Sequence, residues 1–359
     1  MKPKNKLYVI HDDGLLYFEA LKALGENGYV DIETYHLHFF KNLVKGIIRR
    51  KPAFTLKALQ SMVFFIRSFF IRGAVFLVGI APYDPAVFLW ARLLKHNKII
   101  YHTSWPYWDG PDTPVRPLLK GLVKKWWSSF ISHPHLSVVC VLETTKKELV
   151  KFFGKTPGMI SVIPHSVDMS CFRPDKRGSR GPLKVLFTGR LMREKGLEDL
   201  CEVIRKSGGD FEFGIAGEGR DKSLLDSVIN LPNVRYYGRV EGRREMAKVM
   251  RGYDVMLLMS YKRPGWEELF GMAIIEAFAS GLAVVSTDCI GPVNIIKNRK
   301  NGIIIKQRGV GSAVKTLRAL SANRPLLRKL GTEAVKSAKE YTIEKIMHKW
   351  RAAIKAARG

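Results

Sequence analysis

With 359 residues the chain is too long for one ordinary hydrophobic core, since single cores stop growing at about 250 to 300 residues, so we expect two domains. Its 60 Lys and Arg against 32 Asp and Glu leave a net charge of +28, which favours an anionic partner: nucleic acid, an acidic lipid surface or a phosphorylated small molecule. Four cysteines without C-x-x-C spacing argue against a zinc site and a disulfide framework, and a reducing cytoplasm is the simplest setting.

The N-terminal stretch, MKPKNKLYVIHDDG, lacks the apolar run and the cleavage site of a signal peptide, so we expect a chain that is not exported. Short apolar runs then alternate with helical patterns, which predicts parallel sheets with crossover helices, an α/β fold. In the first half the predicted strands are 7–10, 75–79, 98–102, 137–141 and 160–163. In the second half they are 184–188, 211–216, 234–238, 254–259 and 283–287.

Residues 34–83 form a basic and apolar segment with eight Lys or Arg, no Asp or Glu, and phenylalanine pairs at 64–65 and 69–70. This pattern fits a pair of amphipathic helices that lie on a membrane surface, and it also fits a core helix pair with a solvated basic rim. Arg67 and Arg72 interrupt the most apolar run, residues 61–80, so we expect any membrane contact to be peripheral.

Residues 168–182 are rich in Gly, Pro, Ser and charge and have no periodicity, which is typical of a domain linker. We expect an N-terminal Rossmann-like domain at 1–170, a linker at 171–182 and a C-terminal Rossmann-like domain at 183–342. The last segment, 343–359, has the apolar spacing of a helix that can pack back on the N-terminal domain. Two doubly wound domains facing each other leave a cleft outside the carboxyl ends of both sheets, where such folds usually bind ligands.

A glycine turn follows the predicted strand 184–188. Its sequence, GRLMREKG, places Gly189 at a strand-to-helix turn, whose free backbone amides could hold a diphosphate together with Arg190 and Lys195. Basic residues beside strand ends are common in a chain this basic, so the turn taken alone is weak support.

The segment RPGWEELFGMAIIEAFASG, residues 263–281, combines a polar loop with an apolar helix that begins near Met272. Glu268 lies on the loop, and Glu276 lies on the helix, where a carboxylate without a partner is unusual. The amides near Gly271 suit a phosphate, Glu276 could accept both hydroxyls of a ribose, and Glu268 could bind hydroxyls beyond the phosphates. The alternative is that Glu276 pairs with a basic residue of the other domain for structure alone.

In type and order these motifs resemble those of glycosyltransferase family 4, the retaining nucleotide-sugar transferases of GT-B fold, and the resemblance is strong over residues 160–300. TGRLMREKG resembles the family's G-R-L-x-x-x-K-G turn, and IAGEGR, residues 215–220, resembles its second glycine-rich turn. EELFGMAIIEAFASG resembles its E-x-F-G-x-x-x-x-E segment. VIPHSVDMSCFRP, residues 162–174, is similar to its I-P-N-G-V-D-x-x-x-F sequence, with His165-Ser166 in place of Asn-Gly.

The resemblance implies that Arg190 and Lys195 hold the donor diphosphate. It implies that Glu268 holds the donor sugar and Glu276 the ribose. His102, at the end of the predicted strand 98–102, falls where the family carries a His that contacts the donor sugar, and an ordinary strand-end histidine is the alternative. The other donor-binding positions that it implies are Gly14, Gly189, Gly217, Glu218, Phe270, Gly271 and Met272. The loop at Gly14 departs from the family, because one Gly after two Asp replaces the usual glycine pair.

The implied enzyme is a retaining hexosyltransferase that moves a sugar from a UDP- or GDP-linked donor to an acceptor hydroxyl. The basic segments of the first domain lead us to expect a lipid-linked or cell-envelope glycan as that acceptor. Arg190, Lys195 and the helix start at Gly271 would stabilise the departing diphosphate, one of whose oxygens would take the acceptor proton. The chain has no D-x-D motif, so we expect neither a cofactor nor a metal. The basic segments 34–83 and 113–142 lead us to expect an anionic membrane surface as a partner, a peripheral cytoplasmic location and no nucleic acid partner.

Two other functions fit parts of the sequence. A GT-B-fold sugar-nucleotide epimerase would bind the same donor and would need acid/base carboxylates in the first domain, chiefly from Asp12, Asp13 and Asp109. A nucleic-acid-binding protein would interleave basic and aromatic residues on one face, as KGLVKKWW, residues 120–127, does locally. It would leave the paired glutamates unexplained, because carboxylates repel phosphate backbones.

Overall fold

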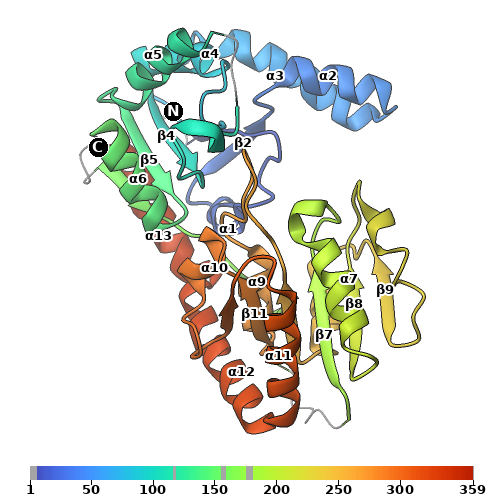
Figure 1. The fold of residues 1–359 in the computed structure, drawn as a ribbon. Coiled ribbons are helices and arrows are strands. Elements are labelled where there is room, and N and C mark those ends of the chain that lie inside the picture. The colour runs from blue at the N-terminus through green and yellow to red at the C-terminus, as the bar shows by residue number, and fades with distance from the viewer. Residues whose placement is uncertain (1–5, 116–118, 155–158, 175–180, 359) are drawn as a thin grey trace. The chain divides into compact units, whose positions relative to one another are not determined.

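The structure is a computed structural model that describes residues 6–115, 119–154, 159–174 and 181–358 (Figure 1). Residues 175–180 of the predicted linker lie outside the described residues. The chain divides into two units. The first comprises the residues up to Ser166 together with those from Ile343 onward, and the second comprises Val167–Thr342. Each unit is built around one six-stranded parallel sheet.

The sheet of the first unit has the strand order β2-β1-β3-β4-β5-β6, and all its neighbouring strands are parallel. The strands are β1 (Lys6–Ile10), β2 (Asp31–Tyr35), β3 (Val75–Val78), β4 (Lys98–Thr103), β5 (Leu136–Cys140) and β6 (Ile160–Val162). The α-helices are α1 (Glu19–Glu26), α2 (Phe39–Ile48), α3 (Pro52–Ser68), α4 (Val87–Ala91), α5 (Lys120–Ile131), α6 (Glu143–Phe153) and α13 (Ile343–Arg358).

Successive side chains of the central strands point to opposite faces of this sheet, because side chains alternate along a strand. Leu77 lies on the face covered by α1 and α13, where Trp350 of α13 is part of the core. Phe76 lies on the other face, where Trp90 of α4 and Trp127 of α5 are buried beside it. A sheet covered on both faces explains why its inner strands are almost entirely apolar.

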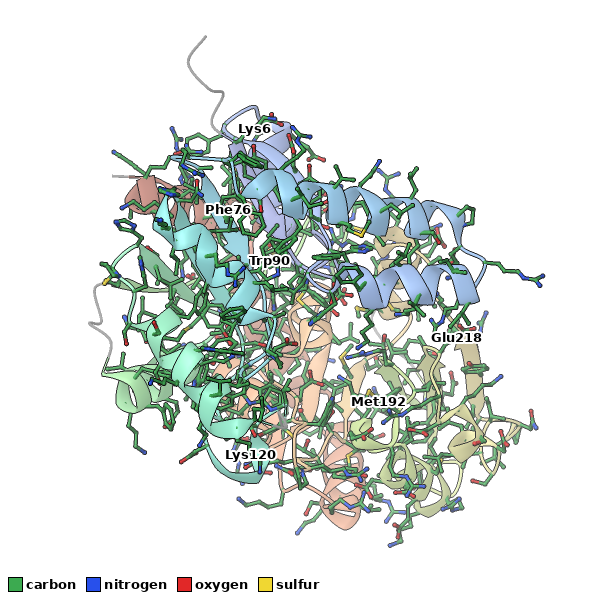
Figure 2. All side chains as sticks on the ribbon, turned by 90° about the horizontal axis from the view of Figure 1, so that it is seen from above. Lys6, Phe76, Trp90, Lys120, Met192 and Glu218 are labelled. Carbon is green, nitrogen blue, oxygen red and sulfur yellow. The ribbon has the colours of Figure 1, made fainter. Side chains whose placement is uncertain are left out.

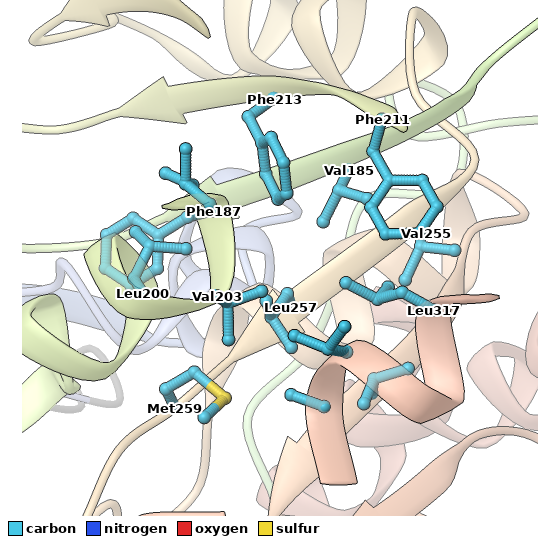
Figure 3. Packing of buried hydrophobic residues seen from close by; sticks show 14 of the residues in the cluster. Val185, Phe187, Leu200, Val203, Phe211, Phe213, Val255, Leu257, Met259 and Leu317 are labelled. Carbon is cyan, nitrogen blue, oxygen red and sulfur yellow. The ribbon is translucent and has the colours of Figure 1, made fainter. Parts of the chain in front are cut away.

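The sheet of the second unit has the order β12-β11-β10-β7-β8-β9 and is also parallel throughout. Its strands are β7 (Leu183–Thr188), β8 (Phe211–Ala216), β9 (Val234–Gly238), β10 (Val255–Leu258), β11 (Ala283–Thr287) and β12 (Ile303–Ile305). Its α-helices are α7 (Leu197–Lys206), α8 (Arg243–Arg251), α9 (Met272–Ala279), α10 (Ile290–Ile295), α11 (Val310–Ala322) and α12 (Arg324–Ala338). Figure 3 shows part of its core, where Val185 and Phe213 of the sheet pack with Leu200 of α7 and Leu317 of α11.

The two parallel sheets confirm the expected α/β fold class, and all ten predicted strands are present, with ends that differ by at most one residue. Two strands were missed, β2 and β12. Each lies at an edge of its sheet and pairs on one side only. An edge strand buries less surface than an inner one, so the acidic sequence DIETY and the short run III do not produce a strong strand pattern.

Candidate functional site

Two glycine turns lie against each other at the carboxyl ends of β7 and β8. Gly189 donates its N–H to the carbonyl of Ala216 (3.1 Å), and Leu191 donates to the carbonyl of Glu218 (2.9 Å). A Cβ on Gly217 would lie 1.9 Å from the Gly189 oxygen, and both glycines have φ near +150°. Since other residues rarely adopt this backbone conformation, both positions require glycine.

The first turn ends at Gly196, just before α7. Its φ is +75°, and a Cβ there would lie 2.1 Å from the carbonyl oxygen of Met259, which follows β10. The turn therefore packs directly on the backbone after the neighbouring strand β10. This close approach places Lys195 beside the polar loop 260–270.

Lys195 and Glu268 form an ion pair in which Lys195 Nζ donates to Glu268 Oε2. Their side chains are only 16% and 13% exposed, so the pair is shielded from bulk water. Ser260 Oγ also donates to Glu268 Oε2 (3.4 Å), and the Lys195 ammonium lies 5.8 Å from the centre of the Trp266 ring. Two predicted catalytic residues that are 73 positions apart thus meet in the second unit.

The neighbouring carboxylate, Glu267, has a different environment. It is buried, and its Oε1 accepts the backbone N–H of Ile290 (2.6 Å) at the start of α10. The backbone carbonyl of Glu268 accepts the N–H of Gly291 (2.8 Å). Glu267 therefore has a structural role in holding α10, which sequence analysis missed, whereas the Glu268 side chain is directed to Lys195.

Gly271 immediately precedes α9, and its φ of +88° favours glycine. Ile274 of the first turn donates its N–H to the carbonyl of Gly271 (2.9 Å), and the amides of Met272 and Ala273 before it have no carbonyl of their own helix to bind, so this end of the helix suits an anion. Phe270 is buried beside it, with its ring centre 6.1 Å from that of Tyr341. Met272, the first residue of α9, is partly exposed.

Glu276 lies in the middle of α9 and is only partly exposed. Burial raises the pKa of its carboxyl to about 7, against the opposing effect of the positive charge on Arg243 of α8. Within the described part of the second unit, the carboxyl group forms no hydrogen bond or ion pair. It is thus a poorly solvated acceptor that a ligand with hydroxyl groups could satisfy.

A second carboxylate, which sequence analysis also missed, joins the loops around Lys195. Glu194 is buried and accepts two hydrogen bonds from Arg220 (3.0 and 3.1 Å) and one from Arg263 (3.4 Å). These residues belong to the first glycine turn, the second glycine turn and the loop after β10. The only signals in the sequence are the Glu in REKG and the Arg in GEGR. Arg190 and Glu218, two of the predicted donor-binding residues, are at least partly exposed.

His102 and Gly14, the predicted site residues of the first unit, lie at the carboxyl edge of its sheet. His102 is buried at the end of β4, and burial, with the neighbouring His165 and His11, holds its pKa well below the usual value. It therefore carries no charge at neutral pH. It lines a narrow cavity together with Tyr17, Phe18, His165, Ser166 and Trp350.

Gly14 has a φ of +55° in the loop after β1, and no atom lies within 4 Å of the position of a Cβ. Backbone conformation rather than space therefore favours glycine here. Its N–H donates to the carbonyl of His11 (3.1 Å), which closes a tight turn.

A charged cluster lies beside this loop. His38 donates from Nδ1 to Asp12 (2.6 Å) and from Nε2 to Asp84 (2.8 Å), while Asn42 donates to Asp12 (2.8 Å). The hydrogen bonds to both carboxylates raise the pKa of His38 to about 9. Burial alone would raise the pKa of Asp12, but its bonds with His38 outweigh this and hold it at about 2. The three residues thus form a stable cluster of two carboxylates and one imidazolium.

The segment KGLVKKWW does not present both of its tryptophans. Trp127 is buried in the core, where its Nε1 donates to the carbonyl of Asp84 (3.1 Å). Trp126 is stacked on Phe88 with ring centres 4.6 Å apart. The tryptophans of this segment therefore do not form an exposed aromatic face, because α5 turns Trp127 into the core.

Several known proteins that this chain resembles are glycosyltransferases. Residues 172–337 match the model of the family described as glycosyl transferases group 1. The chain is 29% identical over 187 residues to one of the subunits of human phosphatidylinositol N-acetylglucosaminyltransferase, and the match covers 50% of this chain and 37% of that protein. It is 24% identical over 277 residues to an uncharacterized glycosyltransferase of Haemophilus influenzae, covering 75% of this chain and 73% of that protein. The chain thus spans well under half the length of the human relative.

Among solved structures, the chain has the fold of Anabaena HepE in complex with UDP. The TM-score is 0.72 at 12% identity, and the alignment covers 98% of this chain and 100% of HepE. At this identity the similarity supports the fold alone.

Proposed function

We propose that this chain moves a sugar from a nucleotide diphosphate to an acceptor hydroxyl. Two findings support this: residues 172–337 match the model of the glycosyl transferases group 1 family, and the two units have the GT-B fold. The observation that carries the proposal is the shielded Lys195–Glu268 pair beside two tightly packed glycine turns. A cation, a carboxylate and free backbone amides at one sheet edge suit a ligand that contains both a diphosphate and a sugar.

The pair can serve both parts of such a donor. An ammonium has three N–H donors, so Lys195 can bind phosphate oxygens while it retains one bond to Glu268. Glu268 has free lone pairs that can accept hydroxyl hydrogens from the sugar. Glu276 accepts the hydroxyls of the ribose, and Arg190 adds a second cation to the turn.

Catalysis in this proposal is electrostatic. The leaving diphosphate gains negative charge in the transition state, and Lys195, Arg190 and the amides at Gly271 stabilise that charge without a metal. The reaction retains the configuration of the anomeric carbon, and a departing phosphate oxygen takes the acceptor proton. For the first unit, the family resemblance leads us to propose neutral His102 as a contact of the donor sugar and the turn at Gly14 as a contact of the diphosphate.

UDP and GDP are the proposed carriers of the sugar. The UDP complex of HepE, a protein of the same fold, supports UDP. We propose a lipid-linked or cell-envelope glycan as the acceptor and the cytoplasmic face of an anionic membrane as the location. The name of the human relative, which includes phosphatidylinositol, supports a lipid-linked acceptor. None of the helices among the described residues is long and apolar enough to span a bilayer.

For each of the two other functions, the structure argues against one of the residues on which it depended. An epimerase in need of an acid/base carboxylate would not find one in Asp12, whose low pKa keeps it ionised between His38 and Asn42. A nucleic-acid site at residues 120–127 would need exposed aromatic rings, and Trp127 is buried.

The direct test measures the melting temperature of the protein with UDP-, GDP- and ADP-sugars. A donor at a hundred times its Kd should stabilise the fold by about 2.7 kcal/mol, since it binds only the native state. Glu268→Gln should lose most of this stabilisation, and Glu267→Gln should serve as the matched control, because its carboxylate faces α10. A melting temperature that none of the donors raises, or an equal loss in both variants, would contradict the proposal.

A further inference from the structure

Helices α2 and α3 form a hairpin that lies beside the sheet of the first unit (Figures 1 and 2). The two helices pack closely, because a Cβ on Gly46 would lie 2.5 Å from Oγ1 of Thr55. The inner face of α3 is anchored by Phe64, whose ring is stacked on Tyr35 at a centre distance of 3.6 Å, and by Ser61, which accepts the N–H of His36 (2.9 Å). The hairpin is therefore firmly attached along one side.

The opposite side of the hairpin is apolar and exposed. Ile48, the last residue of α2, is 74% exposed, and Phe70, two residues after the end of α3, is 80% exposed. The full outer stripe consists of Phe40, Val44, Ile47, Ile48, Leu56, Leu59, Val63, Ile66 and Phe70. Within each helix these residues recur at intervals of three or four, apart from the adjacent Ile47 and Ile48, so they lie on one face. An apolar stripe of this length is unusual on a water-exposed surface.

The charges carried by the segment that forms the hairpin are all positive. Residues 34–83 contain eight Lys or Arg and no acid, and no ion pair involves any of the eight within the described part of the chain. Arg49, Arg50 and Lys51 are exposed in the connection between the two helices. An apolar face with an unpaired cationic border is complementary to a lipid surface that carries negative headgroups.

We infer that the outer stripe of the α2–α3 hairpin docks on an anionic lipid bilayer, with its apolar side chains among the acyl chains and its cations at the headgroups. Its significance for catalysis depends on the proposed transfer to a membrane-borne acceptor, whereas the docking itself can be measured without transfer. His38, immediately before α2, is bonded to Asp12 after β1 and to Asp84 after β3. The hairpin is thereby fixed to the carboxyl edge of the sheet, where α/β folds bind their ligands.

The test is co-sedimentation of the full chain with vesicles of phosphatidylcholine alone and with added phosphatidylserine, over a series of salt concentrations. We expect binding to the anionic vesicles that weakens as salt rises. Each cation near an acidic leaflet raises the partition coefficient about fivefold, so Arg49→Glu, Arg50→Glu and Lys51→Glu together should lower it at least about tenfold. The matched control changes Lys297, Arg299 and Lys300, three exposed cations of the second unit, to Glu.

A second pair of variants tests the apolar stripe. Phe40→Ser, Ile48→Ser and Phe70→Ser together should lower binding at least about tenfold at high salt, where apolar insertion dominates. The control is Leu231→Ser with Val293→Ser, which are exposed apolar residues of the second unit. Far-ultraviolet circular dichroism and melting temperature check that each variant folds.

Three results would overturn the inference. The first is equal sedimentation of the parent with both vesicle types. The second is an equal loss of vesicle binding in the hairpin variants and the control variants. The third is a parent that forms a dimer and does not bind vesicles, together with hairpin variants that are monomeric. The last result would assign the stripe to a second copy of the chain. A separate measurement distinguishes failure of the docking inference from failure of the proposed function. Nucleotide sugars should still raise the melting temperature of the hairpin variants, because the proposed donor-binding residues of the second unit are unchanged in them.

Discussion

Replacing His38 with Ala should destabilise the first unit by an amount that depends on pH. His38 lies between Asp12 and Asp84, and the hydrogen bonds to both carboxylates raise its pKa from 6.5 to about 9. One pKa unit corresponds to about 1.4 kcal/mol, so the shift is equivalent to roughly 3 kcal/mol. Because the His38 side chain is 29% exposed and that of Asp12 is 36% exposed, solvent screening reduces the expected effect to about 2 kcal/mol.

The sign follows from the direction of the shift. A pKa that is higher in the folded state than in the unfolded state stabilises the protein fully below pH 6.5, and this contribution is lost as pH rises through 9. The parent and His38→Ala should therefore differ most at pH 6 and much less at pH 9.5. The acidic partner gives a second limit, because the pKa of Asp12 is held at about 2, so its contribution is lost only as pH falls from 3.8 towards that value.

The assay is urea unfolding followed by tryptophan fluorescence. Six of the seven tryptophans belong to the first unit and only Trp266 belongs to the second, so the signal reports mainly on the unit that contains His38. His348→Ala, an exposed histidine on α13 of the same unit, is the matched control. A difference between parent and His38→Ala that is the same at pH 6 and pH 9.5 would refute the reasoning, since packing rather than charge would then be its source.

Three further predictions concern the proposed site. Lys195→Ala and Glu268→Gln should each lower sugar transfer at least about tenfold in a folded protein. Glu267→Gln should affect transfer less and should lower stability by about 1 to 2 kcal/mol, because it weakens the bond to α10. Initial rates of transfer and melting temperatures separate the two effects. Donor affinity should rise between pH 6 and 8, because the pKa of Glu276 is about 7 and its ionised form accepts ribose hydroxyls better than its neutral form. In isothermal titration, Glu276→Gln should bind the donor more weakly, and its affinity should not change over this pH range. Transfer should continue in excess EDTA, and a complete loss that magnesium or manganese restores would count against the metal-free stabilisation of the diphosphate.

The regular part of the fold was predictable because buried parallel strands carry a strong apolar signal. The strand FEFGIA at 211–216 has the predicted ends, since it is an inner strand buried on both faces. The edge strands β2 and β12 lack that signal, because an edge strand buries less side-chain surface than an inner one, although the edge strands β6 and β9 were predicted. Periodicity thus predicts the centre of a sheet better than its edges.

The site was predictable in its residue types and less so in its contacts. The sequence distinguishes Glu268 from Glu267 only by register with Gly271, while the structure shows that one bonds Lys195 and the other bonds Ile290. The Glu194–Arg220 pair depends on how two loops fold towards each other, which no local pattern encodes. Trp127 shows the opposite error, because its basic neighbours suggested an exposed ring, whereas α5 buries it.

The return of α13 to the first unit makes the second unit an insertion within the first. The inserted part starts and ends at one place, where Val167 pairs with Thr342 and donates its N–H to the carbonyl of Tyr341 (2.8 Å). Its two ends are already adjacent, so closing the gap left by its removal would cost little chain entropy. Joining Ser166 to Ile343 through a few glycines would keep α13 in the core, whereas truncation at Ser166 would remove Trp350 and expose the apolar face beneath it.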